Sequence, residues 1–236
     1  MGVISIMGPK ARDLLQSLTP DDMSHAAFPF ATSREIELGY GYVRASRMTF
    51  VGELGWELYI PTEFMQDTYD RIVAAGAEWD LVHAGYHALN SLRTEKAYRH
   101  WSHDITDEDS PLEAGLDFVV KWDKAGGFVG REALLEQREK GLSRHLLQLR
   151  LKDPEPLIYH NEPIWRDGTL VGHITSGAYV HTLCGAVGLG YVWATPGDAP
   201  EAVLDGHYQV EVACEKITAE VSLRPLYDPE NAKIRS

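Results

Sequence analysis

The strongest constraint on the fold lies in the second part of the chain, where helix patterns stop at Gly141 and short strand patterns recur. Six segments have the length and composition of strands: 145–151, 163–165, 170–175, 186–193, 208–213 and 216–223. Asp167-Gly168, between the second and third of them, is a hairpin-turn signal. Short strands at this spacing are typical of a small closed barrel or a sandwich. We therefore predict a C-terminal β-barrel domain over residues 142–236.

The first part of the chain mixes strand and helix patterns. Residues 3–7 form an apolar strand pattern, and Gly8-Pro9 then opens a helix with proline in its first turn. The remaining expected strands are 34–38, 41–50, 56–60 and the later part of 111–121, and the expected helices are 61–76, 85–97 and 130–140. This order predicts an α+β fold, an antiparallel sheet with helices over residues 1–141. Because the chain opens on such an apolar strand, we expect part of this domain to lie upstream of Met1.

Charge and cysteine content narrow the classes of partner. The chain has 35 acidic and 22 basic residues, a formal net charge of −13, which disfavours nucleic acids and anionic membranes as partners. The first ten residues have no secretory-signal pattern, and no segment has the roughly 20 apolar residues of a membrane helix. Cys184 and Cys214 are expected to be reduced core thiols. Together these features predict a cytoplasmic location.

Glu57 is the first candidate for ligand binding. It follows a glycine-bearing turn (Gly52 to Gly55), in a strand where Trp56, Leu58 and Ile60 alternate with polar residues. Periodicity alone favours a solvent-facing carboxylate. The functional alternative is a carboxylate that grips a planar N–H/NH₂ edge with two parallel hydrogen bonds, and pterins present such an edge.

Arg93 and Phe118 are further candidates. Arg93 lies on the helix expected over 85–97, where the ordinary interpretation is a surface arginine paired with an acid, and the functional one is an arginine that binds a ligand carbonyl or carboxylate. Phe118 is most simply a core aromatic, and it would otherwise form a stacking wall for a flat heterocycle.

Metal and nucleophile patterns are weak. His100 and His103 lie three residues apart beside Asp104, but the chain has no His-Glu-x-x-His pattern, so we predict no metal site. The acidic run 104–109 lacks the central glycine and final acid of a calcium loop, and we interpret it as a solvated acidic turn. Cys184 and His181 are close in sequence without an orienting acid, so we assign no catalytic residue.

Taken together, the motifs resemble the glycine cleavage T-protein (aminomethyltransferase) family, and within it the folate-binding C-terminal half of sarcosine and dimethylglycine dehydrogenases. The resemblance begins with Thr-Phe-Val-Gly-Glu-Leu-Gly-Trp-Glu-Leu-Tyr-Ile-Pro over residues 49–61. It continues, in order and spacing, through 83–89, 91–96, 98–101, 103–109, 111–116, 153–156, 164–168 and 174–177. It covers essentially the whole chain.

This resemblance implies a tetrahydrofolate site. Glu57 matches the carboxylate that binds the pterin edge, and Arg93 matches an arginine of the folate site. Phe118 matches an aromatic beside the folate, and Tyr98 and His103 are expected near the same cleft. The assignment requires the side chains of Glu57, Arg93 and Phe118 to converge on one slot for a flat bicyclic ring.

The resemblance also implies the chemistry. An oxidised N-methyl amine such as sarcosine or dimethylglycine supplies an iminium or formaldehyde-equivalent carbon, which tetrahydrofolate converts to 5,10-methylenetetrahydrofolate. Alternatively, the chain acts as an aminomethyltransferase. The protein would position the folate and exclude water, and Glu57 and Arg93 would transfer no proton. The family's catalytic aspartate precedes the Gly8-Pro9-Lys10 helix, so we expect it outside this chain. The chain has no Gly-x-Gly-x-x-Gly motif, and we expect any flavin domain upstream or on a separate subunit.

Two other functions stay open at this point. The first is a folate-binding module without catalysis, which the expected absence of the catalytic aspartate favours. The second is a structural or interaction role without any ligand. Loss of folate affinity on replacing Glu57 or Arg93 by alanine would argue against this second possibility.

Overall fold

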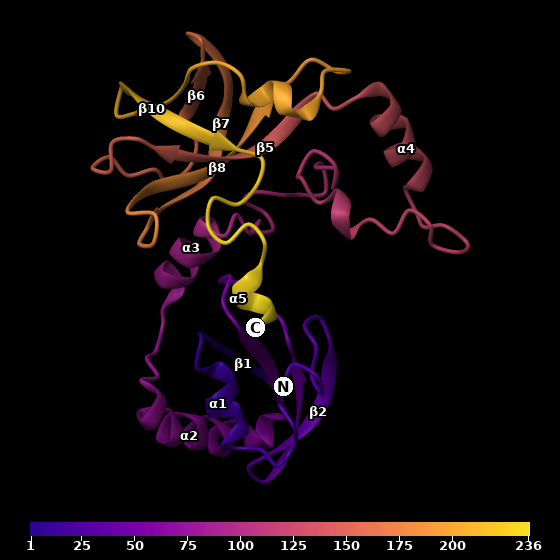
Figure 1. Ribbon diagram of the computed structural model, residues 1–236, viewed down its shortest axis with the longest axis vertical. Coiled ribbons are helices and arrows are strands. Elements are labelled where there is room, and N and C mark those ends of the chain that lie inside the picture. Colours follow the sequence, from indigo (N-terminus) through magenta and orange to yellow (C-terminus); the bar gives the residue numbers. More distant parts are fainter. The chain divides into compact units, whose positions relative to one another are not determined.

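The computed structural model describes residues 1–236, which form two compact units (Figure 1). The first unit comprises Met1–Leu89 together with Glu230–Ser236, and the second comprises Asn90–Pro229. The first is a four-stranded antiparallel sheet with helices, and the second contains a closed six-stranded barrel. The predicted α+β fold, with a helix-bearing sheet followed by a barrel, is therefore confirmed.

The sheet of the first unit has the strand order β1-β4-β3-β2. The strands are β1 (Gly2–Met7), β2 (Ser33–Leu38), β3 (Gly41–Ser46) and β4 (Gly55–Ile60). Its helical elements are α1 (Ala11–Gln16), η1 (Thr62–Phe64), α2 (Met65–Gly76), η2 (Ala77–Trp79) and α5 (Ala232–Arg235). All three strand pairs are antiparallel, so short connections suffice between β2 and β3.

The two faces of this sheet differ in polarity because successive side chains of a strand point to opposite faces. Trp56, Leu58 and Ile60 of β4 are fully buried, and they belong to a core that α1 and α2 complete with Leu15 and Ile72. The opposite face has no helix packed on it in this core, and its side chains are mostly polar and partly or fully exposed, with Val3 and Met7 of β1 as apolar exceptions. This open face carries Glu57.

The barrel closes in the order β10-β5-β8-β7-β6-β9, with β9 pairing back to β10. Its strands are β5 (Arg144–Leu151), β6 (Pro163–Arg166), β7 (Thr169–Val180), β8 (Gly185–Trp193), β9 (Tyr208–Val212) and β10 (Glu215–Ser222). All six predicted strands are confirmed. Asp167 and Gly168 form the turn between β6 and β7 with φ of 51° and 81°, the left-handed values of a two-residue hairpin turn.

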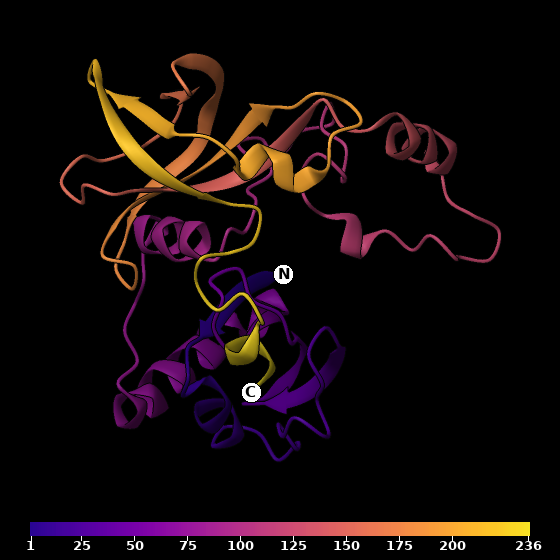
Figure 2. The same cartoon turned by 45° about the horizontal axis from the view of Figure 1, so that its top comes forward.

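Strand β5 is buried on both faces. Leu147, Leu149 and Leu151 face the barrel core, and Gln148 on the other face is buried as well. Gln148 Nε2 donates hydrogen bonds to the carbonyl oxygens of Thr94 (2.7 Å) and Glu95 (3.0 Å), so the C-terminal end of α3 (Tyr86–Glu95) covers it. Figure 2 shows α3 lying against the barrel.

Three further elements of the second unit lie outside the barrel wall. They are η3 (Asp117–Val119), α4 (Arg131–Lys140) and η4 (Pro200–Leu204). Helix α4 has no buried residue and carries many charges, as its sequence indicated. Helix α4 ends at Lys140 and β5 begins at Arg144, so residue 141 lies in the connection between them. That this connection is a domain boundary stays a prediction.

Two strand predictions are wrong in part. The strand expected in the later part of 111–121 is a run of turns with the short helix η3, because Gly115 takes a positive φ of 65° and its neighbours form turn hydrogen bonds such as Leu116 N to Pro111 O. The strand expected over 41–50 ends at Ser46, and Arg47 next to it turns its side chain into the core.

The cysteines are free, as predicted, but their predicted position in the core is wrong. Cys184 and Cys214 are both exposed, because each lies in a hairpin connection instead of a strand. Ala213 and Cys214 alone join β9 to β10, with φ of 50° and 69°, and a two-residue turn of this kind lies outside the barrel core. No helix of the chain combines the length and the apolar character that crossing a membrane requires.

Candidate functional site

Glu57 lies in the middle of a row of small hydroxyl residues on the open face of the first unit. Its neighbours across the strands are Ser5 of β1 and Ser46 of β3, and Ser33 of β2 continues the row. Ser46 Oγ donates to Ser33 Oγ over 2.9 Å. Since serine side chains are short, the space beside the Glu57 carboxylate is not filled by its cross-strand neighbours.

Tyr59 fixes the orientation of this carboxylate. Its hydroxyl donates to Glu57 Oε2 over 2.8 Å, and this hydrogen bond, followed by the negative charge of Glu57, raises the pKa of Tyr59. Glu57 accepts no other hydrogen bond from the protein, so Oε1 and one lone pair of Oε2 remain available. An oriented, half-buried carboxylate with vacant acceptor positions is suited to a ligand that presents two parallel N–H donors.

Arg93 is buried in the second unit, with 4% of its surface exposed. Its Nη1 donates to Asp104 Oδ2 (2.7 Å) and to the carbonyl oxygen of Tyr98 (3.2 Å). Its Nε donates to Asn90 Oδ1 (3.0 Å) and its Nη2 to Ser176 Oγ (2.9 Å). Four of the five guanidinium N–H groups are therefore used within the protein, and one on Nη2 remains.

Asp104 is the acid that pairs with Arg93. Besides Arg93, its carboxylate accepts the backbone N–H of His100 (2.8 Å) and the hydroxyl of Thr175 (2.6 Å). The run 104–109 is therefore not a solvated acidic turn throughout, because Asp104 is buried against the barrel strand β7. Sequence reasoning missed this residue, since an acid in an acidic loop shows no local sign of a partner 71 residues away.

Two more charged residues follow Arg93 on the same segment and are also buried. Glu95 Oε1 accepts the backbone N–H groups of Thr182 (2.9 Å) and Leu183 (3.1 Å) in the turn between β7 and β8. Lys96 pairs with Asp228, with 3.1 Å between Nζ and Oδ2. Arg93, Glu95 and Lys96 each reach a different part of the second unit, so this segment holds it together through polar contacts.

Tyr98 and His103 lie on the loop that Arg93 and Asp104 hold. Tyr98 is half-buried, and burial, followed by the charge of Asp228, raises its pKa. His103 is exposed, and its ring lies 4.7 Å from that of His100 in an edge-on arrangement. Arg93, Tyr98 and His103 therefore all lie in the segment 93–104 of the second unit, which the hydrogen bonds of Arg93 to Tyr98 and Asp104 hold in place.

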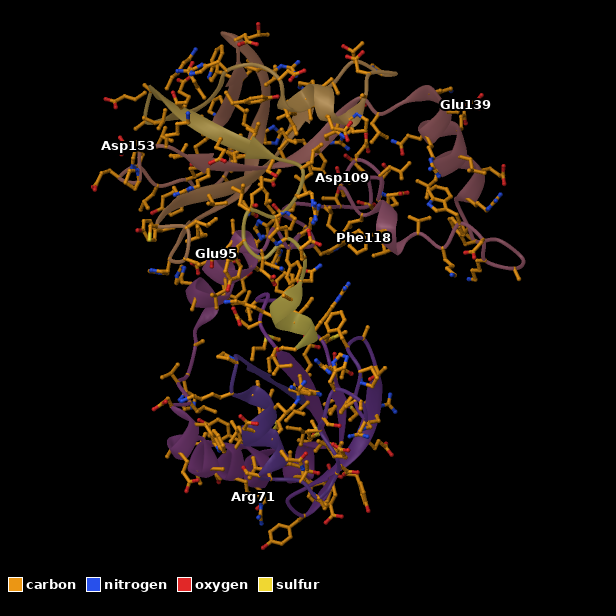
Figure 3. The ribbon with its side chains drawn as sticks, in the orientation of Figure 1. Arg71, Glu95, Asp109, Phe118, Glu139 and Asp153 are labelled. Atoms are coloured by element: carbon orange, nitrogen blue, oxygen red, sulfur yellow. The ribbon has the colours of Figure 1, made fainter.

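Phe118 is 81% exposed and lies on η3, outside the barrel wall (Figure 3). The interpretation as a core aromatic is therefore wrong, and the ring is available to a ligand or a partner surface. Glu57 belongs to the first unit, and Arg93 and Phe118 belong to the second. Their convergence on one slot stays a prediction.

The chain is similar to known proteins over its whole length. The model of the GCVT N-terminal domain matches residues 1–124, and that of the glycine cleavage T-protein C-terminal barrel domain matches residues 144–228. The solved aminomethyltransferase T of the glycine cleavage system from Bartonella henselae superposes with a TM-score of 0.67 and 20% identity, covering 96% of this chain and 84% of that one. At this identity the likeness shows the fold alone.

Two similar relatives are longer enzymes. The 4-methylaminobutanoate oxidase (formaldehyde-forming) of Paenarthrobacter nicotinovorans is 40% identical over 100% of this chain and 28% of its own length. The mitochondrial sarcosine dehydrogenase of Mus musculus is 41% identical over 100% of this chain and 26% of its own length. The chain therefore spans about a quarter of the length of these relatives.

Proposed function

Because more than half of the chain matches the GCVT N-terminal domain, it belongs to the glycine cleavage T-protein family, and we propose that it binds tetrahydrofolate for one-carbon transfer. One relative is named as formaldehyde-forming and another as a sarcosine dehydrogenase. We propose by analogy that the carbon acceptor in this chain is a reduced folate and that the carbon comes from an N-methyl amine. A flavin domain, upstream or on a separate subunit, would oxidise this amine. A cytoplasmic location stays a prediction.

The observation that carries this proposal is the environment of Glu57. A pterin ring presents an N–H beside an NH₂ group, and both donate in the same direction. The Glu57 carboxylate, oriented by Tyr59, has vacant acceptor positions and short serine neighbours at Ser5 and Ser46. These residues fit such a ring, since the serines leave space beside the carboxylate and a carboxylate binds this donor pair with charge-assisted hydrogen bonds.

The second unit would contribute the other folate contacts. In this proposal Phe118 stacks on an aromatic ring of the folate. Arg93 has one N–H left for the ligand, and through its carbonyl and carboxylate partners it also fixes the loop that carries Tyr98 and His103. These four residues keep the roles that the family resemblance implied, as part of the proposal.

In this mechanism the residues of the chain bind and orient, and they transfer no proton. When bound, tetrahydrofolate supplies the N5 and N10 nitrogens that accept a carbon at the oxidation level of formaldehyde. Glu57 accepts hydrogen bonds from the pterin edge and so fixes the direction in which the nitrogens point. Orientation of this kind lowers the entropic part of the barrier, and exclusion of water protects a reactive electrophile.

The test is titration calorimetry of the chain with tetrahydrofolate. Glu57→Gln should weaken binding about 10- to 100-fold, the loss expected when a charge-assisted hydrogen-bond pair is replaced by one mismatched amide. Glu35→Gln is the matched control, because Glu35 is exposed on the same face but lies on the edge strand β2. Unchanged affinity of the Glu57→Gln variant would contradict the proposed site.

A formaldehyde-trapping assay separates catalysis from binding. If the chain binds tetrahydrofolate and also accelerates its reaction with formaldehyde, the transfer function is supported. If it binds the folate without accelerating the reaction, it is a binding module that depends on the remainder of a longer protein for catalysis. Absence of binding would argue for a structural or interaction role.

A further inference from the structure

The N–H group of Arg93 that binds nothing within the protein is held in a fixed direction. The Nε group, both N–H groups of Nη1 and one N–H group of Nη2 donate to acceptors of the second unit. A guanidinium group is planar and presents its five N–H groups in a rigid fork, so acceptors at all three nitrogens fix its position and its rotation. The direction of the fifth N–H group therefore follows from the protein's own contacts.

Ser176, the acceptor at Nη2, follows a bulge in strand β7. Ile174 of β7 pairs with Gly190 of β8. The next pair along the strands joins Ser176 to Leu189, so Thr175 is an extra residue without a partner in β8. Successive side chains of a regular strand point to opposite faces, and a bulge breaks this alternation and re-aims side chains. The bulge therefore allows the side chains of two successive residues to reach the same group.

Both hydroxyl groups at this bulge contact one buried ion pair. Ser176 Oγ accepts from Arg93 Nη2 over 2.9 Å, and Thr175 Oγ1 donates to Asp104 Oδ1 over 2.6 Å. The pair itself is closed by a distance of 2.7 Å between Arg93 Nη1 and Asp104 Oδ2. Ser176 is only 5% exposed, so water competes little for its hydrogen bond. The bulge thus supplies an acceptor to the arginine and a donor to its acid.

The hydrogen bond of Ser176 is not needed to compensate the Arg93 charge. The carboxylate of Asp104 supplies that compensation at Nη1, where the Tyr98 carbonyl oxygen is the second acceptor. Asn90 binds Nε, and Ser176 is the acceptor at Nη2, the nitrogen that carries the fifth N–H group. Ser176 therefore controls the orientation of this nitrogen, and with it the direction in which the fifth N–H group points.

We propose that Ser176, placed by the bulge at Thr175, is a positioning residue that directs the fifth N–H group of Arg93 toward the bound folate. It acts through Arg93 and does not contact the ligand itself. The inference rests on the proposed folate function and deepens it, because it names the residue that keeps Arg93 in its binding orientation. An arginine that is already oriented loses less freedom when the ligand binds, and this preorganisation strengthens binding.

The experiment is titration calorimetry of the chain and its variants with tetrahydrofolate. Ser176→Ala should weaken binding about 3- to 10-fold, the effect of one hydrogen bond. Ser176→Thr retains the hydroxyl group and should restore the affinity. Ser91→Ala is the matched control, since Ser91 Oγ donates to the Tyr179 carbonyl oxygen of the same strand over 2.6 Å and does not contact Arg93. This control should bind tetrahydrofolate like the unmodified chain.

A double-mutant cycle separates positioning from a structural effect. Arg93→Lys keeps a positive charge for Asp104 but has no Nη2 group to orient. In this background Ser176→Ala should therefore cause no further loss of affinity. A general disturbance of the second unit by Ser176→Ala would instead weaken binding by the same factor in both backgrounds.

The possible failures can be told apart. If Glu57→Gln weakens tetrahydrofolate binding and Ser176→Ala does not, the folate proposal stands and the positioning inference is wrong. The inference is also wrong if Ser176→Ala has the same effect with arginine and with lysine at position 93, or if Ser176→Thr binds as weakly as Ser176→Ala. If the unmodified chain binds no tetrahydrofolate, the proposed function fails and this inference fails with it.

Discussion

Replacement of Asp104 by asparagine tests the buried polar network of the second unit. All three groups that Asp104 binds are donors: Arg93 Nη1, the backbone N–H of His100 and the hydroxyl of Thr175. Asparagine has the same shape, but one of its two terminal atoms is an NH₂ group. The amide therefore turns its oxygen toward Arg93 and the His100 N–H, and its NH₂ group toward Thr175, whose hydroxyl can accept while it donates to the Leu189 carbonyl oxygen. The hydrogen bonds can be kept in this orientation, but the Arg93 charge loses its counterion.

The expected loss is large because both side chains of the pair are almost fully buried. Removal of one partner from a buried ion pair costs about 3–5 kcal/mol, mainly because the remaining charge has no compensation. The figure refers to the charge alone, since asparagine can still bind His100 and Thr175. We expect Asp104→Asn to destabilise the second unit by about 3–5 kcal/mol.

Hydrogen exchange followed by mass spectrometry is the appropriate assay, because the two units need not unfold together. Peptides from β5 and β7 should exchange about 10²- to 10⁴-fold faster in the variant, while peptides from β4 in the first unit stay unchanged. Asp107→Asn is the control, since Asp107 is an exposed acid of the same loop. If Asp104→Asn and Asp107→Asn have the same protection, the pair does not hold the loop and the reasoning is wrong.

Three further predictions concern the second unit. Tyr191→Phe should change its stability by less than about 0.5 kcal/mol in urea unfolding, because the buried Tyr191 hydroxyl has no hydrogen-bond partner to lose. Burial lowers the pKa of His145 below 6.5, so the unfolded chain binds the proton of this side chain more tightly than the folded chain. The free energy of unfolding should therefore fall as pH decreases through 6.5. His145→Gln should flatten this part of the plot of melting temperature against pH. Gly168→Ala should cost about 1 kcal/mol in the same urea assay, because φ at this turn position is 81°; a loss near zero would mean that the turn relaxes.

The barrel strands and the two faces of the first sheet could be predicted because their signals are local. Alternation along 56–60 places Trp56 and Leu58 on the buried face and Glu57 on the other, whatever the rest of the chain does. Asp167-Gly168 forms its turn because these two residues tolerate the left-handed conformation. Patterns of this kind involve residues a few positions apart, and one sequence contains all of that information.

The errors arose where the outcome depends on distant residues or on a turn without a signal. Ala213-Cys214 takes the same left-handed turn as Asp167-Gly168, yet its composition does not mark a turn, and the sequence therefore predicts a core position for Cys214. For Phe118 the ordinary interpretation is a core aromatic, because aromatic rings are usually buried, but no element packs over η3 closely enough to bury it.

The amino-acid sequence by itself determined the class of fold, the barrel, and the strand position that exposes Glu57 on an open face. Only the tertiary structure decided that Arg93 and Asp104 are buried, because their hydrogen-bond partners Ser176 and Thr175 lie 83 and 71 residues away. A charge can be buried only where other parts of the chain supply its partners. Local periodicity contains no record of those partners, and so the residues that hold the second unit together became visible only in three dimensions.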